Sequence, residues 1–216
     1  GASAAYSTGR TFPDVNTGDW YYNDVMKCAN SGIIDGLPDG KFHPESSLKR
    51  GEFMKLVAVI ADFVPMTAAV NHWADPYYKV LNNAGVLWGL DIQDTYADLE
   101  KPITRYEMAM MIRNLCFNVY GENAVKLSAP ESHIGDYSSV GSKYLDAVTQ
   151  AYGKGILDGY TDGMFHGDSI LTRGQAAAVV VRTAWASSRK SVSFATEVET
   201  ATGGGLVNAA DSFSFK

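Results

Sequence analysis

Three arginines occupy the same place in three similar segments of the chain. Arg50, Arg105 and Arg173 each begin a stretch that reads as a helix, and each is followed two residues later by Glu or Gln. A cation at the positive end of a helix dipole is mildly unfavourable, so the rules of helix formation do not explain the arginines. Free backbone N–H groups, the dipole and a guanidinium group together predict a site for a carboxylate or a phosphate.

The residue before each arginine shows how the helix starts. Thr104 and Thr172 have Glu107 and Gln175 three residues later, which is the pattern of a capping box. Such a cap contributes about 1 kcal/mol to helix stability. The first segment has Lys49 in place of Thr, so we expect that it lacks the cap but offers a second positive charge to an anion.

Composition narrows the function classes. The chain has 216 residues, of which 46% are hydrophobic and 19% charged, as in an ordinary globular protein. A net charge of −6 argues against nucleic-acid binding, and no apolar run approaches the length of a membrane span. The first six residues lack the apolar core of a signal peptide, so we expect a mature or trimmed chain. Cys28 and Cys116 fall at apolar positions, which favours buried free thiols over a disulfide.

The arginines belong to longer internal repeats, which we predict at 12–61, 72–117 and 133–186, with 187–216 as a linker and the start of a β segment. A glycine precedes the arginine at equal distances in repeats one and three (Gly32 to Arg50, Gly155 to Arg173). In repeat two the distance is two residues longer, and the Asp-Gly turn found at 39–40 and 162–163 is missing.

Each repeat is predicted to contain two helices. The first is amphipathic and ends at a glycine, whereas the second is apolar on most sides and therefore buried. This pattern predicts a mainly α fold in which three second helices form a central bundle and the first helices pack outside. We expect one cooperative domain with short turns or minimal strands between helices, and a long surface loop at 118–132. The alternation at 191–200 and 213–215 predicts one or two strands.

The combination of Phe12-Pro13-Asp14-Val15, a helix ending in Gly-Ile-x-x-Gly, an Asp-Gly-x-Phe turn and Thr-Arg-x-Glu resembles the S-layer homology (SLH) repeat. The resemblance covers 12–184, and three consecutive copies are the usual unit of that family. It implies a pseudo-threefold helical spindle that attaches surface proteins non-covalently to the bacterial cell wall, outside the cell. The implied ligand is a secondary cell-wall polysaccharide carrying pyruvate ketals on N-acetylmannosamine, bound in grooves between repeats.

The resemblance also assigns roles to residues. It places Arg50, Arg105 and Arg173, with Lys49 beside the first, against the acidic sugar. Asp14, Asp75 and Asp136 match the family's Asp and are expected to bind sugar hydroxyls or to fix the groove. Trp20 and Trp73 would offer an aromatic face to a sugar ring.

Each assignment has a structural alternative. The arginines would instead pair with a carboxylate of the adjacent repeat, the aspartates would cap the first helices, and Trp20 and Trp73 would lie in the core, where we also expect Trp88 and Trp185. Repeat two departs most from the pattern, because residues 91–100 replace its turn.

The sequence therefore predicts a non-catalytic cell-wall anchoring module that binds an anionic, pyruvylated polysaccharide, without a cofactor or a metal site. Two rival functions remain open: a self-assembling module of a surface layer, and the targeting part of a cell-wall glycan hydrolase.

Overall fold

The computed structural model describes residues 10–199, and the chain is mainly α-helical, as predicted. We keep the names repeat one, two and three for the predicted segments. The α-helices are α1 (Tyr22–Asn30), α2 (Arg50–Ile60), α3 (Asp75–Asn83), α4 (Tyr96–Glu100), α5 (Arg105–Asn118), α6 (Ser142–Gly153) and α7 (Arg173–Ala184). Short 3₁₀ turns are η1 (Pro130–Ser132), η2 (Tyr137–Ser139) and η3 (Ala186–Ser188), and the strands are β1 (Ala124–Leu127) and β2 (Ala195–Val198).

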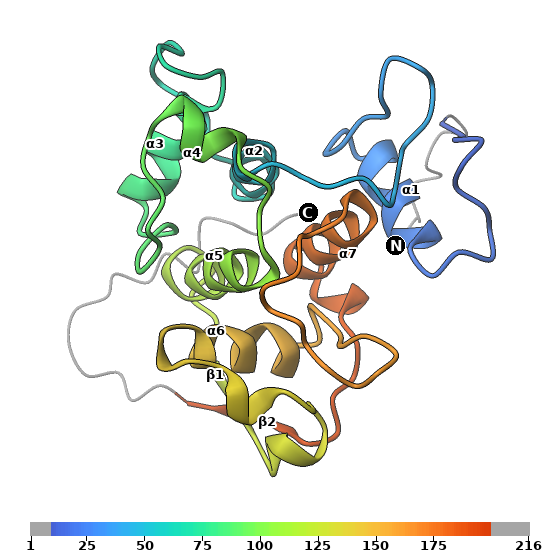
Figure 1. Ribbon diagram of the computed structural model, residues 1–216, viewed down its shortest axis with the longest axis vertical. Coiled ribbons are helices and arrows are strands. Elements are labelled where there is room, and N and C mark those ends of the chain that lie inside the picture. Colours follow the sequence, from blue (N-terminus) through green and yellow to red (C-terminus); the bar gives the residue numbers. More distant parts are fainter. Residues whose placement is uncertain (1–9, 200–216) are drawn as a thin grey trace, which may run out of the picture.

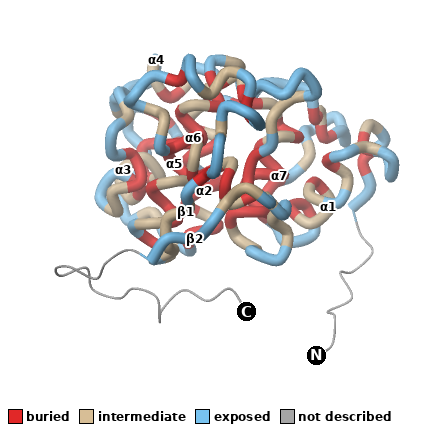
Figure 2. The backbone as a smooth tube through the Cα atoms, turned by 90° about the horizontal axis from the view of Figure 1, so that it is seen from below, coloured by how far each residue is buried: buried red, intermediate tan, exposed pale blue. Residues whose placement is uncertain are grey.

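The second helices of the repeats, α2, α5 and α7, lie at the centre of the molecule, and α1, α3 and α6 lie outside them (Figure 1). Most residues of the three central helices are buried (Figure 2). The predicted central three-helix bundle is confirmed. Helices that are apolar on most sides can keep those sides away from water only in the interior of the fold.

Each outer helix packs on a central helix of the preceding repeat. Helix α3 of repeat two packs on α2, α6 of repeat three packs on α5, and α1 of repeat one packs on α7. The last pair joins the beginning of the chain to its end; there, the Cys28 thiol donates to the carbonyl of Ala177 at 3.5 Å. The repeats are therefore interlocked in a ring rather than arranged as independent units.

A cycle of backbone hydrogen bonds lies where the three central helices begin. The N–H of Leu48 donates to the carbonyl of Leu171, Leu171 donates to Ile103, and Ile103 donates to Leu48, with N···O distances of 3.1, 2.9 and 2.9 Å. All three leucine and isoleucine side chains are buried. One residue from each repeat thus contributes one donor and one acceptor, as pseudo-threefold symmetry requires.

The first helices end as predicted. Gly32, Gly85 and Gly155 have φ angles of +71°, +74° and +70°, a left-handed conformation that glycine adopts without strain. The buried Cys28 and Cys116 are both free thiols, also as predicted.

The C-terminal segment corrects one expectation. Residues 118–132, predicted to be a surface loop, contain β1, which pairs antiparallel with β2 so that Ala124 faces Val198. Arg189, predicted to lie in a linker, donates two hydrogen bonds to the carboxylate of Glu122 at 2.7 and 2.8 Å. The described part of the tail therefore packs on the domain, and the strand expected at 213–215 lies outside the described residues. Among residues 10–199, no helix is long and apolar enough to cross a membrane.

Candidate functional site

The three arginines lie at the boundaries between repeats. We call the contact of repeats one and two the first boundary, that of two and three the second, and that of three and one the third. Arg50 reaches across the first, Arg105 across the second and Arg173 across the third.

Arg105 and Arg173 are almost fully buried, with 2% and 6% of their surface exposed. Arg105 donates from Nε to the carbonyl of Phe165 at 2.8 Å and from Nη2 to that of Asp158 at 2.9 Å. Arg173 makes the same two bonds, at the same distances, to Phe42 and Asp35.

Both guanidinium groups also lie on aromatic rings, at 4.9 Å from the centre of Phe165 and 4.8 Å from that of Phe42. Burial lowers the pKa of both arginines, although the side chains remain cationic, since the reference pKa of Arg is above about 12. In this structure the two arginines hold neighbouring repeats together, as in the structural alternative, but their acceptors are backbone carbonyls rather than carboxylates.

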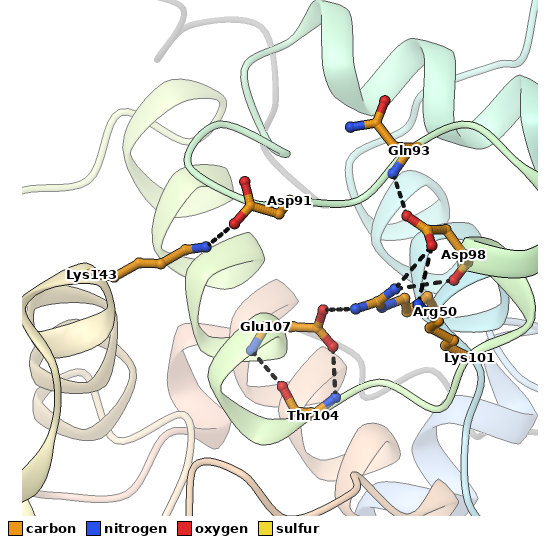
Figure 3. Close-up of polar contacts among 8 residues, drawn as sticks. All are labelled: Arg50, Asp91, Gln93, Asp98, Lys101, Thr104, Glu107 and Lys143. Atoms are coloured by element: carbon orange, nitrogen blue, oxygen red, sulfur yellow. Dashed lines mark hydrogen bonds and ion pairs between the residues drawn. The ribbon is translucent and has the colours of Figure 1, made fainter.

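Arg50 has different partners, because repeat two lacks the Asp-Gly-x-Phe turn whose phenylalanine supplies one of the two carbonyls elsewhere. The carbonyl that Arg50 reaches, from Nη1, is that of Asp98 at 3.4 Å. Nη2 of Arg50 donates to Oε2 of Glu107 at 2.5 Å, and its Nη1 lies 3.9 Å from the carboxylate of Asp98 (Figure 3). Its Nε is buried and has no partner in the part of the chain that the structure describes. Arg50 is thus neutralised by two carboxylates yet retains one unused donor.

The free helix N–H groups expected beside the arginines are already occupied. The amide N–H groups of Arg50, Arg105 and Arg173 donate across the boundaries to the carbonyls of Lys101, Ser169 and Ser46, at 2.8, 2.9 and 2.9 Å. Thr104 and Thr172 accept from the amides of Glu107 and Gln175, which confirms the two predicted capping boxes. At α5 and α7 the expectation of an anion site built on free first-turn amides is therefore wrong, because the adjacent repeats and the caps use those donors.

Asp14 and Asp136 each fix a turn of their own repeat. Asp14 accepts from the N–H groups of Phe42 and His43 at 2.9 and 2.7 Å, and Asp136 accepts in the same way from Phe165 and His166. Burial alone would raise the pKa of Asp14, but these backbone hydrogen bonds outweigh it and lower the pKa. The two aspartates thereby position the carbonyls that receive Arg173 and Arg105.

Asp75 is not equivalent to these two aspartates. It is the first residue of α3 rather than a residue ahead of the helix, and it accepts from the N–H groups of Val70, Asn71 and His72. The predicted match of Asp75 to Asp14 and Asp136 is wrong, because those two aspartates lie eight and six residues before their helices, whereas Asp75 itself begins α3. Trp73 instead corresponds to Trp20, since each lies two residues before its helix.

Trp20 and Trp73 are exposed rather than buried in the core, with 60% and 46% of their surface accessible. Trp88, which was expected in the core, is also exposed, at 68%. Trp20 packs on Tyr21, which lies against Gly174 of repeat three, so its ring is at the third boundary. An exposed ring at a boundary between repeats is a candidate for ligand contact, and Trp73 is the second.

Trp73 belongs to a continuous surface at the first boundary. The buried His72 ring lies 5.3 Å from the Trp73 ring and 5.4 Å from that of the exposed Tyr96. His72 accepts from the N–H of Ala74 at Nδ1, so its Nε2 carries the proton that it donates to Glu100 at 2.7 Å. We call Trp73, His72 and Tyr96 the aromatic platform.

The exposed Lys49 completes this surface. The other oxygen of Glu100 accepts a hydrogen bond from the ammonium group of Lys49. This contact stabilises protonated Lys49 and raises its pKa. Lys49 makes no side-chain cap to its helix, as predicted, and instead places a cation beside the platform. Sequence reasoning missed His72, Tyr96 and Glu100, although the His-Trp pair before α3 and an aromatic residue in 91–100 were available signals.

The second boundary contains a pocket of about 210 Å³, lined by Tyr106, Asp136, Ser139, His166, Gly167, Asp168 and Ser169. The Tyr106 ring packs directly over Gly167, where a Cβ atom would lie 1.9 Å from it, and stacks on Tyr144 at 4.9 Å. Arg105 does not line the pocket. Among residues 10–199, no three His, Cys, Asp or Glu side chains are close enough to hold a metal ion.

Comparison with known proteins supports two of the three predicted repeats. The model of the S-layer homology domain matches residues 11–54 and 133–177, within repeats one and three. An uncharacterised cell wall amidase of Bacillus anthracis is 30% identical over 185 residues, which cover 81% of this chain and 32% of the relative.

Two other relatives extend the comparison. An endoglucanase of a Bacillus species is 29% identical over 181 residues, covering 81% of this chain and 19% of that enzyme. The S-layer protein EA1 of Bacillus anthracis is 28% identical over 144 residues, covering 62% of this chain and 16% of that protein. The chain thus spans a third or less of each of these relatives. The family match and these relatives place the chain at the bacterial cell surface and support a cell-surface anchoring module, with similarity to the S-layer homology domain in residues 11–54 and 133–177.

Proposed function

We propose that residues 12–186 form one non-catalytic module of three repeats, with 72–117 as a diverged copy that the family model does not match. The module anchors a larger protein non-covalently to the bacterial cell wall by binding an anionic, pyruvylated secondary cell-wall polysaccharide. The main binding surface is the first boundary, formed by the aromatic platform, Lys49 and Arg50.

The observation that carries this proposal is the continuity of Lys49, Glu100 and the platform. Exposed aromatic rings provide the flat apolar faces on which sugar rings stack, and a tethered ammonium group provides a partner for the carboxylate of a pyruvate ketal. An ion pair between Lys49 and the ligand carboxylate is needed in a chain of net charge −6, because the rest of the surface repels an acidic polymer.

Arg50 adds a second cation to this surface. Its Nε lacks an acceptor within residues 10–199, and such an unpaired donor costs about 1–3 kcal/mol. Because Nε is buried and the side chain is 14% exposed, a ligand carboxylate would gain this donor only if the Arg50 side chain turned outward. Arg105 and Arg173 support binding by fixing the repeats, with Asp14 and Asp136 holding the turns that receive them. Trp20 provides a further exposed ring at the third boundary, so that two weak contacts on one polymer would reinforce each other.

The test is calorimetric titration of a short pyruvylated wall-polymer fragment and of the same fragment without its pyruvate. Lys49→Ala and Arg50→Ala should each weaken binding of the pyruvylated fragment about tenfold, the loss of a charge-assisted hydrogen bond of about 1.5 kcal/mol, and should leave the neutral fragment unaffected. Trp73→Ala should weaken both fragments. Trp88→Ala is the matched control, because it removes a tryptophan outside the platform that is even more exposed, at 68% against 46% for Trp73.

Equal affinity for the two fragments would contradict recognition of the pyruvate. An unchanged affinity in Trp73→Ala, together with a loss in Trp20→Ala, would move the principal site to the third boundary.

A further inference from the structure

Two carboxyl groups meet beneath the aromatic platform. Asp75 is 1% exposed and lies at the start of α3, directly after the segment that carries His72 and Trp73. Asp94 lies in the segment that leads to Tyr96, and its carboxyl group is within hydrogen-bonding reach of that of Asp75. The pair therefore joins the two segments that supply the rings of the platform.

The donors around this pair do not account for all of its oxygens. Oδ2 of Asp75 accepts three backbone N–H groups, from Val70, Asn71 and His72, at 2.7, 2.5 and 3.1 Å. Oδ1 of Asp75 and Oδ1 of Asp94 are both buried and have no donor in the described part of the chain. Two ionised carboxylates in contact without a donor between them would repel each other strongly, and one proton removes both the repulsion and the two unpaired acceptors.

The surroundings decide which residue holds that proton. Burial would raise the pKa of Asp75, but the contact with Asp94 and the three backbone N–H groups lower it to about 2. Burial, followed by the contact with Asp75 and its negative charge, raises the pKa of Asp94. The other groups that face Asp94 are Lys79 and Tyr78 on α3 and His72 before it, and the positive groups only partly offset the increase.

We propose that Asp94 keeps its proton in the folded protein and donates it to Oδ1 of Asp75, and that this hydrogen bond fixes Tyr96 relative to Trp73. Asp75 and Asp94 are thus positioning residues for the platform. The shared proton itself does not depend on the proposed function, whereas its effect on wall binding does.

The expected pH dependence of stability follows from the directions of the two pKa shifts. A raised pKa at Asp94 contributes stability that is complete below its ordinary pKa of 3.8 and is lost as the pH rises through the folded-state value. The lowered pKa of Asp75 acts oppositely, since its contribution is present above 3.8 and is lost as the pH falls towards about 2. The two effects can therefore be separated by substitution.

The experiment compares Asp94→Asn with Asp75→Asn in the whole chain. The side-chain amide introduced by Asp94→Asn would donate to Asp75 without needing a bound proton. This variant should therefore unfold at or above the wild-type temperature near neutral pH and show a flatter profile between about pH 4 and about pH 7. Asp75→Asn removes the anion that three N–H groups bind and should unfold at a lower temperature throughout that range. Carbon-13 NMR of the aspartate carboxyl groups should show one titration well above the others. It should be absent in Asp94→Asn and should move toward the other aspartates in Asp75→Asn, where the negative charge beside Asp94 is gone.

Three outcomes would overturn the proposal: no aspartate with an elevated titration, equal destabilisation by the two substitutions, or a Ca²⁺-dependent stabilisation of the wild type that Asp94→Asn abolishes. The last would mean that a cation rather than a proton bridges the pair. Polymer affinity measured across the same pH range tests the link to binding. A wild type that binds no polymer would reject the proposed function, while the NMR result would still decide the proton.

Discussion

The first boundary and the other two use the same motif for different purposes. At the second and third boundaries the arginine enters a turn of the next repeat and is buried against two carbonyls and an aromatic ring. At the first boundary the turn is missing, and Arg50 pairs with Asp98 and Glu107 while one of its donors stays unused. Because carbonyls carry no net charge, burial of the two arginines depends on the geometry of these hydrogen bonds and on the charge of nearby carboxylates, such as Asp136 and Asp14.

This difference shows that a repeated charged residue need not mark a repeated ligand site. The arginine, the first-turn amides and the aspartate of an intact repeat boundary form a closed set of hydrogen bonds. In the diverged repeat two this set of hydrogen bonds is incomplete. The exposed aromatic platform and Lys49 lie at the same boundary, the first one. The following predictions test this comparison.

The largest effect is expected from Arg105→Ala and Arg173→Ala. Each removes the donor to two carbonyls in a buried site, so the free energy of unfolding should fall by about 3 kcal/mol or more. Arg50→Ala removes an ion pair whose side chains are 14% and 8% exposed. Because Glu107 and Asp98 keep hydrogen bonds from the N–H groups of Thr104 and Gln93, the loss should be smaller, about 2 kcal/mol. Urea unfolding of the three variants measures the contrast, with Lys55→Ala as a control, because Lys55 is exposed and lies on the same helix as Arg50. Equal losses in all three arginine variants would contradict it.

The second largest effect is expected from a substitution where α1 packs on α7 and closes the ring of repeats. Val25→Ala creates a cavity in α1 beside α7 and should lower the free energy of unfolding by about 2 kcal/mol. If the repeats form one cooperative domain, amide exchange in α5 and α7 should accelerate as much as exchange in α1. Faster exchange confined to α1 would show that repeat one unfolds separately.

A smaller effect distinguishes the second boundary from the third. Tyr106 lies on Gly167, whereas in the third boundary Gly174 lies against Pro44. Gly167→Ala should cost about 1–2 kcal/mol through overpacking on the Tyr106 ring, and adding Tyr106→Gly should recover part of that loss. A double-mutant cycle measures the coupling, and strictly additive losses would argue against a direct contact.

The smallest effect concerns the missing cap of repeat one. Lys49→Thr should supply the cap found in the other repeats and stabilise the fold by up to about 1 kcal/mol, as measured by thermal unfolding. The same variant should lose affinity for the pyruvylated fragment. A stabilised variant with unchanged binding would remove Lys49 from the site and leave the cap as its only role.

Much of the fold was predictable because its signals are local. The capping boxes at Thr104 and Thr172, the left-handed Gly32, Gly85 and Gly155, and the apolar second helices all follow from rules that act within a few residues. The site was less predictable. Lys49, Trp73 and Trp20 were identified by type and spacing, but His72, Tyr96 and Glu100 become relevant only through contacts between separate segments.

The sequence by itself determined the helices, their caps, the glycine stops and the placement of one arginine in each predicted repeat, since these depend on local backbone geometry and on hydrophobic periodicity. Only the tertiary structure decided that α1 pairs with α7, that Arg105 and Arg173 are buried against carbonyls, and that Asp75 meets Asp94. Those outcomes depend on which hydrogen-bond donors and acceptors of distant segments meet. The sequence shows that repeat two lacks the turn, but the effect on the partners of Arg50 becomes visible only in the contact between repeats one and two.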